Sequence, residues 1–359
     1  MPDRPTMPRL RVVGSAARPP GSLREAFSDG SAWIGLGSAV AAGFGVEAIK
    51  SIATGDARGR WWFILLFAVG LALIIFGFRK RGQLRRTNVG IVATVFDARR
   101  SLARAEQLDA QAETYSQNTC QHTFKTSFRL PDDLADSSQL VDALAEETLA
   151  AITMAERLTP GASRINLIPT MPLHIAFWFG AKLGHSHARQ ISVHAIRERD
   201  GEPSYFPATS LRAVEHTVEP LILEPLRTIS ESPVAALALD LQGRGDQFFD
   251  QVVAACHQHR IGRLLPLRSP HSQLSPDEQT FTGVVEQTCR AWRDAPLPDA
   301  SRTARHAIFL SGPVAISLTL GARLASNNHG RWTAFTLNQQ TGEYEPFPPS
   351  PKNEHNQLE

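Results

Sequence analysis

The chain contains few cysteines, and they form no pattern. Three occur among its 359 residues, Cys120, Cys256 and Cys289, and no two of them make a C-x-x-C pair. An odd and widely spaced set suits a reducing cytoplasm better than the disulfide framework of a secreted protein. We expect the three thiols to be buried apolar side chains.

The motifs of several enzyme classes are also missing. The sequence has no H-E-x-x-H, no G-x-S-x-G and no P-loop, and because no G-x-G-x-x-G follows a first strand a nicotinamide site is disfavoured. Two H-x-H pairs, His185/His187 and His257/His259, have no cysteine or acid at ligand spacing, so we do not expect a metal there. The sequence therefore predicts a protein that is not an enzyme and needs no cofactor.

Basic residues are scarce relative to acids in the larger part of the chain. The net charge is +2, but residues 1–86 carry 13 Lys and Arg against five acids, a net charge of +8, which leaves −6 for residues 87–359. Wrapping a long DNA or RNA requires an extended basic face, so a long nucleic-acid partner is not expected. A small anionic ligand is not excluded, because it needs only a local site.

Charge is absent from residues 61–78, which read WWFILLFAVGLALIIFGF. As a helix this run spans about 27 Å, close to the thickness of a bilayer core. Trp61 and Trp62 stand at one end, where indoles favour the interface, and five uncompensated basic residues follow between 79 and 86. The run predicts a membrane-spanning helix whose C-terminal side is cytoplasmic; the alternative is a buried core helix.

Residues 32–49 form a second, weaker apolar segment. Gly37, Ala41 and Gly45 recur every four residues, which predicts a smooth helical stripe for close packing against another helix in the membrane. Glu47 near the end of the segment is tolerable at the interface. A signal peptide is disfavoured, because the polar N-terminus is long and cleavage would not remove the second apolar run.

Together the two segments predict a transmembrane hairpin over residues 31–80. The arginine-rich residues 1–30 favour a cytoplasmic N-terminus, so both ends of the hairpin lie on the same side. Residues 88–350 follow it, and the polar residues 351–359 are expected to be a disordered tail.

A sequence repeat marks the larger part of the chain. Residues 164–184 and 306–325 share the pattern P-x-x-I-x-x-x-x-G-A-[KR]-L at a constant offset of 141 positions. The pattern is filled by Pro172, Ile175, Gly180, Ala181, Lys182 and Leu183 in the first copy and by Pro313, Ile316, Gly321, Ala322, Arg323 and Leu324 in the second. Each copy reads as a buried strand, a turn, a proline in the first turn of a helix, the helix, and another strand.

The segments upstream of each copy also alternate between strand and helix. In the first half we expect strands over residues 89–96 and 119–130 and a helix over 140–158; in the second half the order is strand, helix, strand, helix. Alternation of this kind predicts α/β layers with mostly parallel sheets. We therefore expect two Rossmann-like halves, about 88–208 and 233–348, joined by residues 210–232.

The two repeat copies resemble a known family. Residues 305–348, with FLSGPVAISLTLGARL followed by RWTAFTL and YEPF, resemble the SAVED domain, and the first-half segment IPTMPLHIAFWFGAKLG followed by ISVHAI matches its corresponding part. The resemblance covers about two thirds of the chain. It implies two fused CARF-like modules that sense a cyclic oligonucleotide in the anti-phage systems called CBASS, in which a companion nucleotidyltransferase makes the signal.

Two helices before a SAVED domain look like the membrane-effector branch of that family. The resemblance implies an anti-phage effector that binds a cyclic di- or trinucleotide, forms a ligand-induced homo-oligomer and disrupts the inner-membrane lipid, which kills the infected cell (abortive infection). The implied location is the cell inner membrane, multi-pass, with the N-terminus and the SAVED domain cytoplasmic. Two alternatives stay open: a membrane-anchored enzyme that processes a nucleotide, because Rossmann-like folds host many chemistries, and a ligand-gated channel.

Ligands of open α/β sheets bind beyond the carboxyl ends of the strands, where helix N-termini favour phosphate. Thr170 and Met171 in the first half, and Ser311 and Gly312 in the second, occupy such positions. Gly312 allows a ligand to approach the backbone closely. The alternative is a tight strand–helix turn without a ligand.

The loops after the first strand of each half supply the other candidates. These are Arg99 in the first half and Gln242, Gly243 and Arg244 in the second. The arginines can pair with phosphates and Gln242 can read a base edge; the alternative for the arginines is solvated surface. Asp97 and Asp240 at the loop starts are expected to act as caps rather than as ligand contacts.

Overall fold

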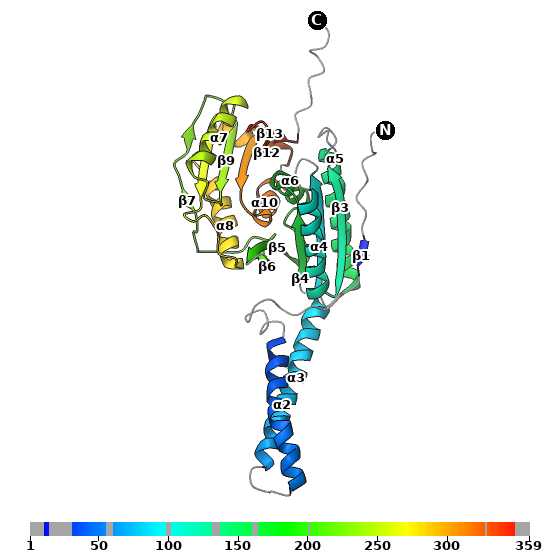
Figure 1. Ribbon diagram of the computed structural model, residues 1–359. Helices are drawn as coiled ribbons and strands as arrows, with labels where there is room; N and C mark the ends of the chain where they lie inside the picture. The colour runs from blue at the N-terminus through cyan, green and yellow to red at the C-terminus, as the bar shows by residue number, and fades with distance from the viewer. Residues whose placement is uncertain are drawn as a thin grey trace.

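Two β-sheets with the same core strand order form the larger part of the protein (Figure 1). The computed structural model describes residues 11–13, 31–54, 60–97, 102–130, 137–159, 164–199, 202–326 and 329–348. Strands and helices alternate along the chain from residue 88 onward, as the sequence predicts for mixed α/β layers.

The first sheet has six strands in the order β1-β3-β2-β4-β5-β6. Its inner four are parallel, and the middle of each is largely buried, whereas β1 and β6 pair antiparallel at the two edges. The bounds are β1 Arg11–Val13, β2 Asn88–Asp97, β3 His122–Leu130, β4 Arg164–Thr170, β5 Gln190–Arg199 and β6 Glu202–Ser210.

The second sheet repeats this order, β13-β12-β11-β9-β10-β7, with β8 also pairing with β10. Its parallel core β10-β9-β11-β12 corresponds strand for strand to β3-β2-β4-β5, and β13 pairs antiparallel as β6 does. The bounds are β7 Ile222–Leu223, β8 Arg227–Thr228, β9 Ala235–Asp240, β10 Arg263–Arg268, β11 His306–Ser311, β12 Trp332–Leu337 and β13 Tyr344–Phe347.

Helices cover both sheets. In the first half they are α4 Leu102–Thr119, α5 Ser137–Leu158 and α6 Leu173–Leu183. In the second half they are α7 Asp246–Gln258, α8 Glu278–Asp294, α9 Asp299–Thr303, α10 Val314–Leu320, a π-helical continuation η2 Gly321–Ala325, and a short 3₁₀ turn η3 His329–Arg331. One large apolar core runs through both halves, because α6 and α10 are buried between the two sheets.

The repeated glycines explain how the halves join. A Cβ atom on Gly180 would collide with the carbonyl oxygen of Leu318, and one on Gly321 would collide with that of Phe177. Leu318 stands 141 positions after Phe177, as Gly321 does after Gly180, so each half offers the other the same contact. The shared glycine of the repeat therefore lets α6 and α10–η2 pack backbone to backbone about a pseudo-two-fold axis.

These two helices run in the same direction. The hydroxyl of Ser317 donates to the carbonyl oxygen of Leu173 over 2.7 Å, and further along both helices His185 Nδ1 lies 3.2 Å from Ser326 Oγ. The contacting residue numbers increase together, so the N-termini of α6 and α10 lie at one common end of the interface.

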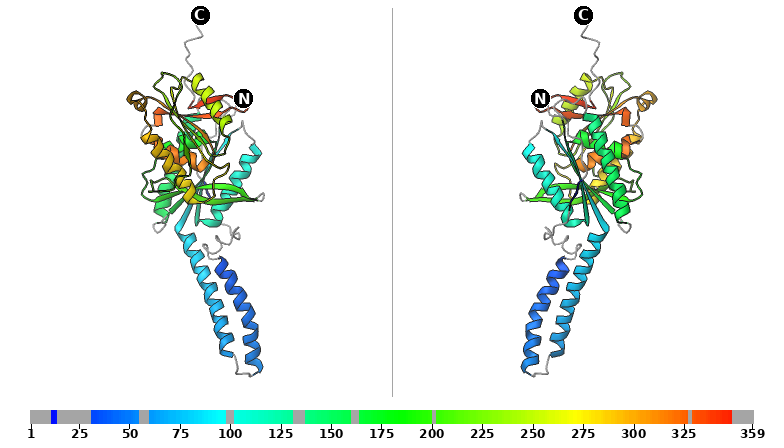
Figure 2. Two further views of the ribbon diagram at one scale, coloured as in Figure 1. Left: turned by 90° about the vertical axis from the view of Figure 1, so that its left-hand side faces the viewer. Right: turned by 90° about the vertical axis from the view of Figure 1, so that its right-hand side faces the viewer.

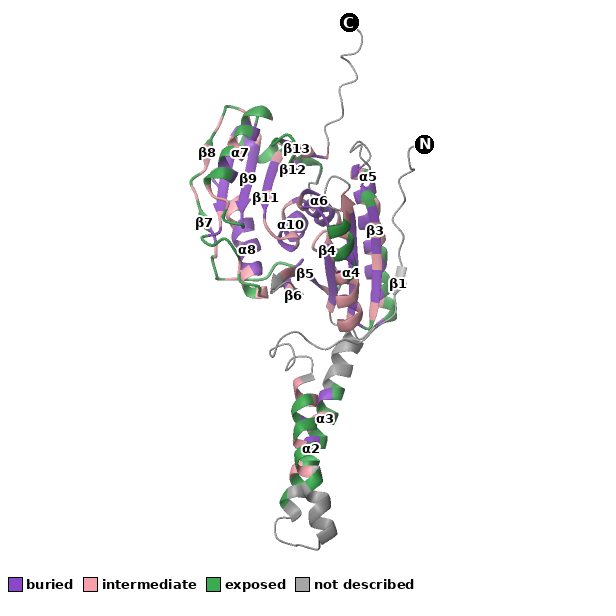
Figure 3. Cartoon of the chain, viewed as in Figure 1, coloured by how far each residue is buried: buried purple, intermediate pink, exposed green. Residues whose placement is uncertain are grey.

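A helical hairpin projects from this body (Figures 1 and 2). It consists of α2 Ser31–Thr54 and α3 Arg60–Thr87, and α3 leads directly into β2. Gly37 packs against Gly70, where an added Cβ would lie 2.6 Å from the Gly70 carbonyl oxygen, and Ala41 is buried against the same turn. Most other described side chains of the hairpin are exposed, including large apolar ones (Figure 3).

The prediction of a membrane-spanning hairpin is wrong. Among the residues that the structure describes, no helix combines the length and the apolar character that crossing a bilayer requires. The multi-pass location in the inner membrane, with a cytoplasmic N-terminus and SAVED domain, is corrected with it.

Candidate ligand site

The N-termini of α6 and α10 lie side by side at the carboxyl ends of β4 and β11. Pro172 and Pro313 occupy the N-cap positions, with φ of −60° and −72°, so a fixed proline φ starts each helix directly after its strand. Parallel helices place their positive dipole ends together, and an anion at that end stabilises both. This edge is therefore shared by the two halves and suited to a ligand with more than one negative group.

Asp240 organises the second half of the edge. It ends β9 in register with Ser311 of β11 and is fully buried. Its carboxylate accepts hydrogen bonds from the backbone N–H groups of Gln242 (3.1 Å) and Gly245 (2.7 Å). These two amides consequently point at Asp240 and not at the site, and the aspartate acts as the cap that the sequence suggests.

Loss of this cap has a predictable effect on stability. Asp240→Ala removes two hydrogen bonds to a carboxylate, so we expect the free energy of unfolding to fall by about 2 kcal/mol, with a smaller loss for Asp240→Asn. Urea denaturation of the full chain measures it. The exposed Asp250 of α7 is the control, and Asp250→Ala should change stability by less than about 0.5 kcal/mol. An equal loss in the two alanine variants would refute the capping role.

Gln242 and Ser311 are brought together by the fold. The Ser311 hydroxyl donates to Gln242 Oε1 over 3.0 Å, although the two residues are 69 positions apart. Gln242 is exposed, and its amide nitrogen forms no hydrogen bond within the described part of the chain. Ser311 therefore orients the amide of Gln242 so that its N–H donors are available to a ligand.

Arg244 is oriented along α7. One guanidinium nitrogen donates to Gln251 Oε1 over 3.1 Å, and the group lies 6.0 Å from the ring of Phe248. A guanidinium has five N–H donors, so this contact fixes the side chain and leaves further donors for a phosphate. Gly243 has φ +65°, and a Cβ there would lie 2.8 Å from Ser272 Cα, so this glycine allows a close approach of two loops.

The remaining candidate residues are Gly312, Met171, Thr170 and Arg99. A Cβ on Gly312 would lie 2.8 Å from the Cβ of Leu241, so the glycine makes room for the neighbouring loop. Met171 is 7% exposed and its side chain belongs to the core, which leaves only its backbone to face a ligand. Thr170 is half-buried at the end of β4. Arg99 lies outside the described residues.

The two halves differ at this edge. Thr94 pairs with Thr170 in the register in which Asp240 pairs with Ser311, so Thr94 is the structural counterpart of Asp240. The Thr94 hydroxyl donates to Asp109 of α4 over 2.6 Å, and β2 continues beyond it to Asp97. Within the described residues, the first half therefore has a strand residue bonded to α4 where the second half has the loop cap Asp240.

The loop that follows β10 also lies at this edge, although the sequence did not point to it. The Ser269 N–H donates to the Asp240 carbonyl oxygen over 2.8 Å, and Ser272 packs against Gly243. His271 donates its N–H to Ser269 Oγ over 3.1 Å and is exposed. The rule that ligands gather at carboxyl ends could have identified this loop, because it directly follows a predicted strand.

Reactive thiols and a metal cluster are not part of this edge. The three cysteines are buried, as expected, and burial raises the pKa of Cys256 and of Cys289 to about 12, so these thiols stay protonated near neutral pH. The described residues contain no group of His, Cys, Asp and Glu side chains that could hold a metal ion. In the H-x-H pairs, His185 bonds to η2 and His259 Nε2 lies 3.0 Å from the Tyr344 carbonyl oxygen.

Fold and site together define a two-sheet α/β protein with one anion-suited edge shared by its halves. No protein-family model matches the sequence, and neither does any curated protein. Among solved structures, the chain is similar to the Cap4 SAVED/CARF-domain containing receptor of Acinetobacter baumannii with the cyclic trinucleotide 2′3′3′-cAAA, at 12% identity, with 83% of this chain and 60% of that chain covered and a TM-score of 0.44.

Two further structures show the same likeness. The A. baumannii receptor with 3′3′3′-cAAA gives a TM-score of 0.42 at 12% identity, covering 83% of this chain and 61% of that one. The Cap4 SAVED/CARF-domain containing receptor of Moraxella osloensis gives 0.37 at 11% identity, covering 88% and 75%. The chain thus spans about 60% of the length of the A. baumannii receptor, and all three TM-scores lie below 0.5.

Proposed function

We propose that this protein is a SAVED-type receptor that binds one cyclic di- or trinucleotide across the shared edge of its two halves, as an effector of a CBASS anti-phage system. The observation that carries the proposal is the parallel packing of α6 and α10, which puts two helix N-termini at the carboxyl ends of two sheets. A cyclic oligonucleotide presents repeated phosphates to such a repeated site. The two SAVED-like repeat segments supply these two strand–turn–helix units and give the proposal its family context.

Each neighbouring side chain has a role in this proposal. Gln242, oriented by Ser311, donates its amide N–H groups to a base edge. Arg244 pairs with a phosphate while its contact with Gln251 holds it in place. Long nucleic acid is not proposed as a ligand, because residues 87–359 carry a net charge of −6.

The protein is proposed to act as a receptor without catalysis and to self-associate when the ligand binds. The Gly37/Ala41/Gly45 stripe is not proposed as the contact between copies, since Gly37 and Ala41 pack against α3 of the same chain; Gly45 lies outside the residues whose side chains are described. Disruption of the inner membrane depended on membrane-spanning helices and is not part of the proposal.

Gln242→Ala tests the proposed site. Loss of its hydrogen bonds to the ligand is expected to weaken binding about 5- to 10-fold, equivalent to ~1–1.4 kcal/mol. Isothermal titration of the full chain with a panel of cyclic di- and trinucleotides measures the affinity. Gln258→Ala, at the exposed far end of α7, is the matched control and should bind as the wild type does.

Two results would count against the proposal. Equal affinity of Gln242→Ala and wild type would move the base contact away from this loop. Turnover of the nucleotide during the titration, followed by chromatography, would instead favour the nucleotide-processing enzyme that the sequence leaves open.

A further inference from the structure

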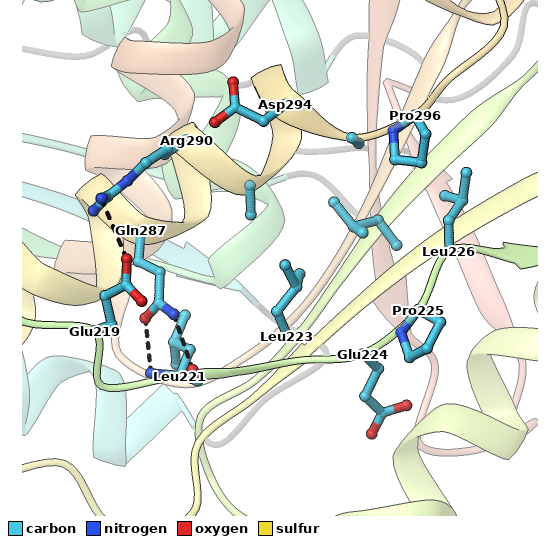
Figure 4. Close-up of a pocket in the computed structure, with 13 residues that line it drawn as sticks. Glu219, Leu221, Leu223, Glu224, Pro225, Leu226, Gln287, Arg290, Asp294 and Pro296 are labelled. Atoms are coloured by element: carbon cyan, nitrogen blue, oxygen red, sulfur yellow. Dashed lines mark hydrogen bonds and ion pairs between the residues drawn. The ribbon is translucent and has the colours of Figure 1, made fainter.

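A hollow lies beside β7, away from the candidate ligand site, and Figure 4 shows the residues that line it. It has a volume of about 750 Å³ and lies between the connecting segment of residues 219–226 and the C-terminal half of α8. This volume is within the range of about 300–1,000 Å³ typical of ligand pockets. We call this hollow the α8 groove.

The wall of the α8 groove is held in place by hydrogen bonds. Gln287 is buried and bonds both backbone groups of Leu221: its Oε1 accepts from the N–H over 2.8 Å and its Nε2 donates to the carbonyl oxygen over 2.9 Å (Figure 4). The Glu224 N–H donates to the Pro266 carbonyl oxygen over 3.1 Å. A preformed wall lowers the entropy that a partner must lose on binding.

The α8 groove favours an apolar partner that brings a cation to Asp294, because the other two rim carboxylates are already paired with arginines. Its surface is largely apolar, and the side chains that form it are Leu221, Leu223, Leu226, Leu265, Ala291 and Ala295. The rim carries three carboxylates and one guanidinium, Arg290, which pairs with Glu219 over 3.2 Å. Glu224 pairs with Arg227 and Arg268. Asp294 is exposed and forms no ion pair within the described part of the chain, so it is left to meet a cation.

The same chain contains a segment of matching chemistry. Residues 1–10 read MPDRPTMPRL, with prolines at positions 2, 5 and 8 and arginines at 4 and 9. Polyproline II has three residues per turn, so a proline at every third position forms one apolar face. Proline-rich segments in general bind apolar grooves with little loss of entropy, and a flanking arginine can pair with an exposed carboxylate.

The groove is out of reach of this segment in its own chain. Residue 10 precedes β1, the outer strand of the first sheet, whereas the groove lies beside β7, the outer strand of the second sheet. Figure 1 shows these strands on opposite sides of the body. Ten residues of polyproline II reach about 31 Å. The first sheet alone spans about 24 Å from β1 to β6 at ~4.8 Å per strand, and α8, which is about 10 Å across, packs against β6 and carries the groove on its C-terminal half.

We infer that the α8 groove binds residues 1–10 of a second copy of the chain. The contact joins different surfaces of the two copies, so it is heterologous and repeats from copy to copy into a ring or filament. This contact between copies requires no nucleotide, so it is additional to the proposed ligand-induced self-association and does not depend on it.

A labelled peptide tests the contact directly. A synthetic peptide of residues 1–10 with a C-terminal fluorophore is titrated with the full chain, without nucleotide, and binding is followed by fluorescence anisotropy. We expect saturable binding that weakens at high salt, because the rim contacts are ionic. Asp294→Lys should weaken binding at least 10-fold, whereas Asp250→Lys on α7, an equal charge change outside the groove, should leave it unchanged.

Charge exchange makes the test specific. A peptide with Arg4→Glu and Arg9→Glu should not bind the wild type and should bind the Asp294→Lys chain at least 10-fold more tightly than the wild type. Nucleotide affinity, measured on the same preparations, should not change with Asp294→Lys, which separates failure of this inference from failure of the proposed receptor function. Absence of peptide binding, or equal binding by wild type and Asp294→Lys, would overturn the inference.

Discussion

Gly180→Ala is expected to lower the free energy of unfolding by about 3 kcal/mol, at the upper end of the cost of overpacking a core. The added Cβ would collide with the carbonyl oxygen of Leu318, a backbone atom that cannot turn aside as a side chain can. Relief requires α6 and α10 to separate along the whole interface. Because the repeat places Gly321 in the equivalent contact with Phe177, Gly321→Ala should cause a loss of similar size.

Urea denaturation of the full chain measures both variants. Gly330→Ala is the matched control, since nothing lies within 4 Å of a Cβ at that glycine, and its midpoint should stay close to that of the wild type. A Gly180→Ala midpoint equal to the control would mean that the helices are not in backbone contact. A large loss at Gly180 with none at Gly321 would contradict the pseudo-two-fold relation between the halves.

Arg323→Met is expected to destabilise the chain by about 3 kcal/mol. Arg323 donates to both carboxylate oxygens of Glu286, over 2.6 and 3.1 Å, and the two side chains are only 9% and 15% exposed. Removing the arginine leaves Glu286 nearly buried and without its cation. Glu286 also accepts from the backbone N–H of Val214, so the pair links η2, α8 and the segment that connects the halves.

The repeat supplies the comparison for this prediction. Lys182 is the counterpart of Arg323, and it pairs with Asp142 through one contact of 2.7 Å with side chains 24% and 34% exposed. Solvent screens this pair more strongly, so Lys182→Met should lower stability by only about 1 kcal/mol. Equal losses in Arg323→Met and Lys182→Met would contradict the argument from burial.

The sequence repeat predicted much of the fold for a physical reason. Each copy carries a buried apolar strand and an apolar helix, and these patterns allow few alternatives to a parallel α/β layer. Helix α4 was not predicted, because its sheet-facing positions are small or polar: the buried ones are Asp109, Ala112 and Ser116. The hydroxyl of Thr94 and the ammonium of Lys125 donate hydrogen bonds to the Asp109 carboxylate. These partners lie on β2 and β3, so the sequence of α4 itself shows no apolar periodicity.

The sequence indicated the parts of the candidate site but not their assembly. The sequence indicated Ser311 and Gln242 separately, since each follows a strand, whereas their hydrogen bond depends on the pairing of β9 with β11. The parallel alignment of α6 and α10 could not be predicted from either segment alone. The glycine repeated at positions 180 and 321 was the only part of this contact that the sequence showed. In the hairpin, Gly37 and Ala41 of the predicted stripe pack against α3 of the same chain, which a short connection holds at high effective concentration, whereas Gly45 lies outside the described side chains.

Calorimetric stoichiometry tests the central claim most directly. The claim is that the N-termini of α6 and α10 form one anion site shared by both halves. Titration of the full chain with 2′3′3′-cAAA, 3′3′3′-cAAA and cyclic dinucleotides should find at least one ligand that binds with one molecule per chain, while the matching linear oligonucleotide binds more weakly. The claim would be contradicted if two ligand molecules bound independently to each chain, one in each half. It would also be contradicted if the folded chain bound none of these cyclic nucleotides.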